Sequence, residues 1–170
     1  TIGYIGSFPI PEVIRDINSS FMAAKSVNPD VTMKIVWVNS WYDPGKETDA
    51  ANALMDQGVD VLLQHTDSPA PLIAAEKRGK RAIGQASDQS SFAPTAHVFS
   101  VRDDWAPYYI KVTQAVMDGT YEPSDFWGGF QEEMLSLASI NDNLPTDVRA
   151  KIDETYAKIK SGEFHPFTGP

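Results

Sequence analysis

Polar and aromatic side chains follow each of four short apolar stretches, and these residues are the most capable of chemistry. They are Ser7–Phe8, 39–43 (NSWYD), 65–68 (HTDS) and 85–88 (QASD). If the apolar stretches are parallel strands, their carboxyl ends meet at one edge of a sheet, which is where ligands bind. Aromatic rings can stack on a flat molecule, and hydroxyl and carboxylate groups can hydrogen-bond to it. These residue types favour binding of a small molecule over a chemical reaction.

Each candidate also has a structural interpretation. Trp41 either packs in the interior or presents a platform to a flat ligand, and the adjacent Tyr42 and Asp43 favour the platform. Asp67 and Asp88 either accept hydrogen bonds from a ligand or stabilise loops and helix ends. The candidate ligand-binding residues are Phe8, Trp41, Thr66, Asp67, Ser68, Asp88, Trp105 and Trp127.

The segment His65–Ser68 carries more polar groups than a junction between a strand and a helix requires. Ser68 is predicted to cap the following helix. Thr66 and Asp67 are then free to face a crevice at the sheet edge. We expect His65 to be a hydrogen-bonded residue at the strand end rather than a ligand contact.

Signatures of catalysis and metal binding are absent from the sequence. It has no GxSxG turn, no GxxxxGK[ST] phosphate loop and no GxGxxG. The histidines at 65, 97 and 165 are widely spaced and cysteine is missing, which argues against a zinc site. An enzyme that uses Asp67 or Asp88 as a general base is an alternative, but no nucleophile–base pair accompanies them. We expect a protein that is not an enzyme and needs no metal or cofactor.

The composition is that of a globular domain. With 170 residues, the chain can form one sizeable core but not two separate ones. A net charge of −9 without a basic run argues against nucleic acid and against an anionic membrane surface as partners. The absence of cysteine excludes disulfides and is compatible with either an oxidising compartment or the cytoplasm.

The first half of the chain alternates between strands and helices. Asp43 is predicted to cap the second helix, with Pro44 in its first turn and Gly58 after its last. Strands rich in Val, Ile and Leu with helices between them indicate parallel βαβ units, covered on both faces. The predicted strands are 2–6, 32–38, 60–64 and 81–86.

After Asp88 this alternation ends. A short strand at 98–101, a helix at about 104–119, a strand within 127–140 and a helix at 144–162 are predicted. Trp105 and Trp127 follow irregular segments, so they are either core residues or mark places where the chain passes between two lobes. Because Thr1 already opens a core strand, we expect the sequence to be the later part of a longer protein.

Several segments together resemble the BMP (basic membrane protein) family of substrate-binding proteins of ABC importers. They are GYIGSFPIPEVIRDINSSF, VNSWYDPGKETDAANALMDQGVDVLLQHTDSPAP, AIGQASDQ, WAPYYIKVTQAVMDGTY and WGGF. The resemblance implies an α/β three-layer sandwich with a central parallel sheet, a lobe of the type I periplasmic-binding fold. It implies that 1–100 belong to the second lobe, that 101–122 cross a hinge and place a helix in a missing first lobe, and that 123–170 return with a strand and a helix.

The resemblance also assigns residues. Trp41 matches the family position at which an aromatic residue stacks on the purine. Thr66, Asp67 and Ser68 replace a glycine-rich loop near the sugar, so the sugar contact is expected to differ or to be missing. Many nucleoside-binding relatives read GVDSDQ where this chain reads GQASDQ, and Ala86 stands where their first aspartate holds the ribose. The resemblance therefore favours a free purine base such as adenine over a nucleoside.

The remaining implications concern partners and location. The resemblance implies a purine ligand, a membrane permease of an ABC importer, a first lobe of the same protein, and a periplasmic or cell-surface lipoprotein. A ligand-sensing domain of a regulator or receptor on the same fold is the alternative.

Overall fold

A computed structural model describes residues 1–166 and contains one sheet of six strands. The strand order is β2-β1-β3-β4-β5-β6; neighbours from β2 to β5 are parallel, and β6 is antiparallel to β5. The strands are β1 (Ile2–Gly6), β2 (Met33–Trp37), β3 (Val61–His65), β4 (Arg81–Ala86), β5 (His97–Asp103) and β6 (Leu135–Ala138). The helices are α1 (Pro11–Val27), α2 (Pro44–Asp56), α3 (Ala70–Lys77), α4 (Ala106–Met117) and α5 (Thr146–Ser161), with a 3-10 turn at Ser90–Phe92.

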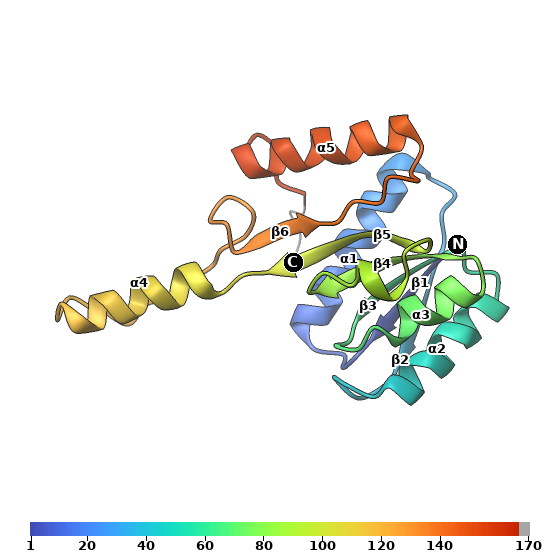
Figure 1. Ribbon diagram of the computed structural model, residues 1–170, viewed down its shortest axis with the longest axis horizontal. Helices are drawn as coiled ribbons and strands as arrows, with labels where there is room; N and C mark the ends of the chain where they lie inside the picture. The colour runs from blue at the N-terminus through green and yellow to red at the C-terminus, as the bar shows by residue number, and fades with distance from the viewer. Residues whose placement is uncertain (167–170) are drawn as a thin grey trace.

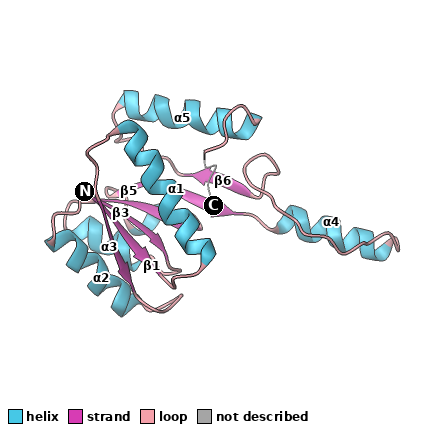
Figure 2. Cartoon of the chain, turned by 180° about the vertical axis from the view of Figure 1, so that it is seen from behind, coloured by secondary structure: helices cyan, strands magenta, loops and turns pink. Residues whose placement is uncertain are grey.

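The sheet has helices on both faces, because alternate strand residues point to opposite sides. On one face Tyr4 packs with Val13 and Ile17 of α1. On the other face Ile5 and Leu62 belong to a larger core formed with α2 and α3. Figure 2 shows α1 on the side opposite to α2 and α3. The predicted three-layer α/β architecture is confirmed.

The predicted strand positions agree with the structure to within one residue for the first four strands. Asp43 caps α2 as predicted, since its side chain accepts the Lys46 N–H at 3.1 Å. The predicted cap of α3 was wrong in detail: Pro69 is the N-cap residue, and no side chain caps the helix from that position. The proline in the first turn of α3 is Pro71, and it costs no hydrogen bond, because the N–H groups of the first turn have no partner within the helix.

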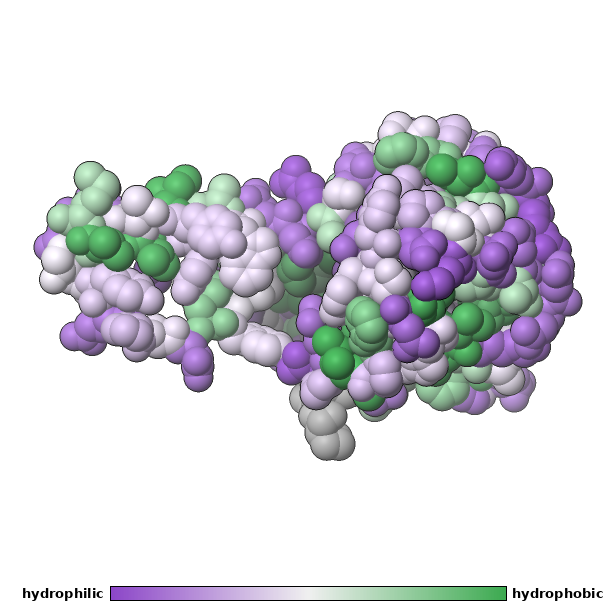
Figure 3. Space-filling model, turned by 90° about the horizontal axis from the view of Figure 1, so that it is seen from below, coloured by the Kyte–Doolittle hydropathy of each residue, from purple (hydrophilic) through white to green (hydrophobic). Residues whose placement is uncertain are grey.

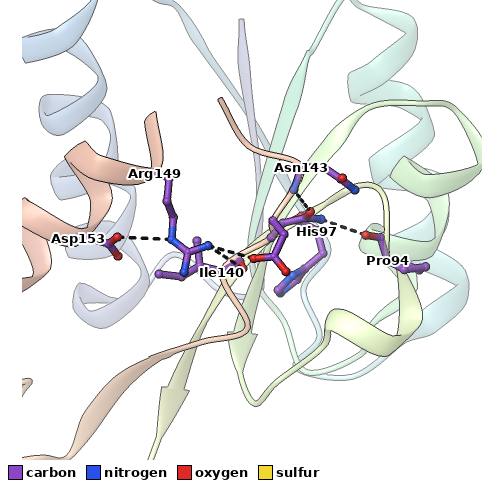
Figure 4. A network of polar contacts seen from close by, with 8 residues as sticks. Pro94, His97, Ile140, Asn143, Arg149 and Asp153 are labelled. Atoms are coloured by element: carbon purple, nitrogen blue, oxygen red, sulfur yellow. Dashed lines mark hydrogen bonds and ion pairs between the residues drawn. The ribbon is translucent and has the colours of Figure 1, made fainter. Parts of the chain in front are cut away.

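The second half of the chain is attached to the sheet by β6 and α5. Asn141 donates from its side-chain amide to the carbonyl oxygens of Pro94 (3.0 Å) and His97 (2.7 Å). Arg149 of α5 lies 3.4 Å from an Asp142 oxygen and 3.5 Å from one of Asp153 (Figure 4). These contacts tie the segment after β6 to the start of β5, and α5 to that segment.

The helix α4 and the segment that returns along it, which we call the arm, project away from the rest of the molecule (Figure 1). No residue of α4 is buried. Its exposed apolar side chains include Tyr109, Ile110, Val116 and Met117, and Figure 3 shows apolar surface along this arm. Within residues 1–166, no helix has the length and apolar character that crossing a membrane requires.

Candidate ligand-binding site

Three rings meet at the carboxyl edge of the sheet, and we call them the aromatic group: Phe8, Trp41 and His65. Phe8 follows β1, Trp41 follows β2 and His65 ends β3, so adjacent strands bring them together. The Phe8 and Trp41 ring centroids are 5.5 Å apart, and the Trp41 and His65 centroids are 5.9 Å apart with the rings edge to face. Trp41 keeps 38% of its surface exposed, which leaves part of the ring open to a ligand.

His65 is held between the aromatic group and acidic residues of α1. Its Nδ1 lies 2.9 Å from Asp16 Oδ2 and its Nε2 lies 3.6 Å from Glu12 Oε1. The Nδ1 contact is not aligned along the N–H direction, so it is a short electrostatic contact, an ion pair when His65 is protonated, and not a well-formed hydrogen bond. The contact with Asp16 raises the pKa of His65, against the opposing effect of burial, and the charges of Glu12 and Asp67 act in the same direction as Asp16.

A fourth carboxyl group lies nearby at the end of β5. The pKa of Asp103 is raised, chiefly by desolvation and also by the charges of Asp16 and Glu12, while His65 opposes this shift. The neighbourhood of His65 is therefore acidic. Residues 1–166 contain no group of three or more His, Asp or Glu side chains arranged to hold a metal ion.

The loop that carries Trp41 is tied to the segment after β3. The backbone N–H of Asp67 donates to the Trp41 carbonyl oxygen at 2.8 Å. Ser68, predicted to cap α3 and to contact a ligand, donates its hydroxyl to Glu47 Oε2 of α2 at 2.5 Å and accepts the Ala70 N–H at 3.3 Å. Its side chain is fully buried, so Ser68 faces the interior of the lobe.

The other two polar residues of this segment differ in exposure. Thr66 is fully buried, and its hydroxyl has no hydrogen-bond partner among residues 1–166, as is also true of Ser7 Oγ after β1. Only Asp67 has an exposed side chain, so it is the member of the segment that a ligand can reach from outside. Gln64, also buried, donates to the carbonyl oxygens of Thr66 and Ser68.

Asp88 uses its carboxylate within the protein. One oxygen accepts the Ser90 N–H at 3.0 Å, and the other accepts the Ser139 hydroxyl, which follows β6. These bonds, first of all that from Ser139, lower the pKa of Asp88. The strand β4 stops at Ala86, whose φ of 59° turns the chain before Asp88. Of the two interpretations of Asp88, this geometry matches the stabilising one.

The structure does not place the predicted tryptophans of the second half in the aromatic group. Trp105 lies at the base of the arm and packs with Tyr108 and Tyr109. Trp127 is 80% exposed, and the Arg15 guanidinium of α1 lies 4.9 Å from its ring centroid.

Sequence reasoning missed the role of Glu47, which is fully buried and contacts Asp43 and Ser68. Its position four residues after the cap Asp43 was visible, but the contact with Ser68 spans 21 residues of sequence. His65 was expected to be a hydrogen-bonded residue at a strand end; it ends β3, and its polar neighbours there are the carboxylates of Asp16 and Glu12 of α1.

In an open parallel sheet, ligands bind outside the carboxyl ends of the strands, which is where Phe8, Trp41 and Asp67 lie. The chain belongs to the Bmp family, the PnrA-like ABC transporter substrate-binding proteins, whose family model matches residues 1–165. It is 54% identical over 168 residues to a purine-binding protein of Brucella abortus (strain 2308), covering 99% of this chain and 48% of that protein.

Two further relatives extend the comparison. A Haloferax volcanii protein named as an ABC transporter glucose-binding protein is 37% identical over 169 residues, covering 99% of this chain and 43% of that protein. The structure of an ABC transporter solute-binding protein from Conexibacter woesei aligns with a TM-score of 0.70 at 23% identity, covering 96% of this chain and 56% of that one. The chain thus spans about half the length of the relatives that it matches.

Proposed function

We propose that this chain is the second lobe of a substrate-binding component of an ABC importer, and that it binds a purine compound at its carboxyl sheet edge. The observation that carries this proposal is the partly exposed Trp41 ring at a strand end, with Phe8 beside it. Stacking on an aromatic side chain contributes about 1–3 kcal/mol per base. The purine-binding relative at 54% identity supports the same ligand class.

The division of the chain follows from this proposal. In it, 1–100 and 123–170 belong to the lobe, of which 167–170 lie outside the described residues, while 101–122 cross a hinge and place α4 in a first lobe. The projecting α4 supports this division, because its side chains Ile110 and Met117 are 69% and 75% exposed. Such side chains are normally covered by other protein. Closure of two lobes then selects the ligand that contacts both.

Within the purine class, we propose a free base such as adenine as the preferred ligand. Ala86 presents a methyl group at the position where a carboxylate would hold ribose hydroxyls. Asp88, the nearest carboxylate in sequence, is already bonded to Ser90 and Ser139. Asp67 remains exposed and available to a ligand N–H. Delivery to a membrane permease, from a periplasmic or cell-surface lipoprotein, completes the proposal.

Calorimetry on the full-length protein tests this function with adenine, adenosine and glucose as ligands. We expect adenine to bind more tightly than adenosine, and glucose to bind weakly. Clearly tighter binding of adenosine would mean that another acceptor replaces the carboxylate missing at Ala86. Tight binding of glucose alone would refute the purine assignment while leaving the importer class intact.

A substitution then tests the ring itself. Trp41→Ala should weaken adenine binding by at least about 1 kcal/mol, because the stacking surface is lost. Tyr42→Ala is the matched control, since Tyr42 is the adjacent exposed aromatic residue and lies outside the aromatic group. Unchanged affinity of a folded Trp41→Ala protein would make Trp41 a packing residue.

A further inference from the structure

Glu47 is a fully buried carboxylate in the first turn of α2. A charged group removed from water destabilises the fold unless hydrogen bonds replace its hydration. Both oxygens of Glu47 have such partners: Oε1 accepts the Asp43 N–H at 2.9 Å, and Oε2 accepts the Ser68 hydroxyl at 2.5 Å.

These two partners belong to the two segments that hold Trp41, the loop before α2 and the segment after β3. Asp43 is two residues after Trp41, and Ser68 follows Asp67, whose N–H donates to the Trp41 carbonyl oxygen at 2.8 Å. Glu47 therefore closes a ring of contacts from α2 through Ser68 and Asp67 to Trp41 and back through Asp43. Gln64 also binds the segment after β3, because its side-chain amide donates to the Ser68 carbonyl oxygen at 2.9 Å.

Helix capping alone does not account for Glu47. Asp43 already accepts the Lys46 N–H and caps α2 with its own side chain. The bond to Ser68 joins α2 to a segment 21 residues away. The Trp41 ring packs against Phe8 and His65, at 5.5 and 5.9 Å between centroids, while its backbone carbonyl oxygen accepts the Asp67 N–H, so its orientation depends on both the ring packing and the position of its backbone.

We propose that Glu47, acting with Ser68, is a positioning residue that holds Trp41 in the orientation required to stack on the ligand. The proposal rests on the proposed ligand-binding role of Trp41. It predicts that Glu47 and Ser68 influence affinity only through that ring, since neither side chain is exposed to the ligand.

The test is a double-mutant cycle in the full-length protein with adenine as the probe. Glu47→Ala removes both bonds and is expected to weaken adenine binding about fivefold, a change equivalent to about 1 kcal/mol, because the loss reaches the ligand only through the position of the ring. In the Trp41→Ala background the same substitution should cause no further loss, because the ring that it positions is already absent. Glu47→Gln keeps an acceptor for the Asp43 N–H and should restore most of the affinity.

Glu76→Ala is the matched control. Glu76 lies at the C-terminal end of α3, away from Ser68. It also accepts hydrogen bonds from backbone N–H groups of a distant segment, those of Thr95 and Ala96. Its removal should lower stability without changing the affinity for adenine. If Glu47→Ala does not fold, Ser68→Ala serves in the same cycle, because it removes one bond of the ring and only one hydroxyl group. Equal losses in both Trp41 backgrounds, or unchanged affinity of the folded variants, would overturn the proposal.

A ligand-free measurement separates this proposal from the proposed function. Near-ultraviolet circular dichroism and fluorescence quenching report the orientation and exposure of tryptophan, and the Trp41→Phe protein identifies the Trp41 contribution. Glu47→Ala should change that contribution even if wild-type protein binds no adenine. An unchanged Trp41 signal would refute the positioning role independently of the ligand.

Discussion

The ion pair between His65 and Asp16 should make the stability of the protein depend on pH. Asp16 raises the pKa of His65 above the value of 6.5 expected for an unfolded chain. The folded state therefore binds a proton more tightly than the unfolded state. The resulting stabilisation is complete below pH 6.5 and is lost as pH rises through the raised pKa of the folded protein.

The magnitude follows from the exposure of the two partners. The side chain of His65 is 10% exposed, but that of Asp16 is 50% exposed, so solvent screens the pair. The contribution of this pair to the free energy of unfolding should lie between that of a hydrogen bond to a charged group and that of a surface ion pair, at about 1 kcal/mol. Asp16→Asn should lower the free energy of unfolding by about this amount near pH 6, and by less near pH 9, because the contribution of the pair is lost as pH rises through the raised pKa of His65.

Urea denaturation at the two pH values measures this difference, and the proton resonances of the His65 ring report its pKa directly. Asp153→Asn is the control, because Asp153 pairs with Arg149, which does not titrate in this range. Its effect should be equal at both pH values. Since Glu12, Asp67 and Asp103 also face His65, its pKa should fall in Asp16→Asn but not reach that of an isolated buried histidine. An unchanged His65 pKa in Asp16→Asn would refute the reasoning.

Two further predictions concern stability. Burial lowers the pKa of His97, so the neutral side chain contributes stability that is present above pH 6.5 and is lost as pH falls through the lowered pKa. His97→Gln should therefore reduce the loss of stability at acid pH, as measured by urea titrations. An unchanged dependence of the free energy of unfolding on pH would contradict this. Ala86 has a left-handed φ of 59°, so Ala86→Gly should raise the free energy of unfolding by about 0.5–1 kcal/mol. Ala82→Gly, in the interior of the same strand, should lower it, and equal effects would exclude backbone strain at Ala86.

The sheet could be predicted because its information is local. Val, Ile and Leu recur at strand positions such as Ile5 and Leu62, and Pro44 and Gly58 mark the ends of a helix beside them. The position of the candidate site was inferred from the parallel order, since Trp41 lies in the loop between β2 and α2, at the carboxyl end of the strand. Local information also identified Asp43 as a cap, because its partner is three residues away.

The orientation of polar side chains at the site could not be predicted, because their partners are distant in sequence. Ser68 bonds to Glu47 across 21 residues, and Asp88 bonds to Ser139 across 51. A serine before a helix can cap that helix or turn toward a neighbouring one. The choice depends on whether a buried acceptor is present nearby, which only the packing of α2 against α3 determines.

The four polar residues 65–68, at the carboxyl end of β3, illustrate how a binding surface could be built. His65 pairs with α1, Thr66 lies in the interior, the Asp67 N–H reaches the loop of Trp41, and Ser68 reaches α2. One short segment thus fixes the relative positions of three others before any ligand is present. A ring that packing already holds in place loses little conformational entropy when a ligand stacks on it, so contacts behind such a ring can increase affinity without touching the ligand. Under the proposed function, the buried contacts behind Trp41 would therefore belong to the binding site as much as the exposed face of its ring does.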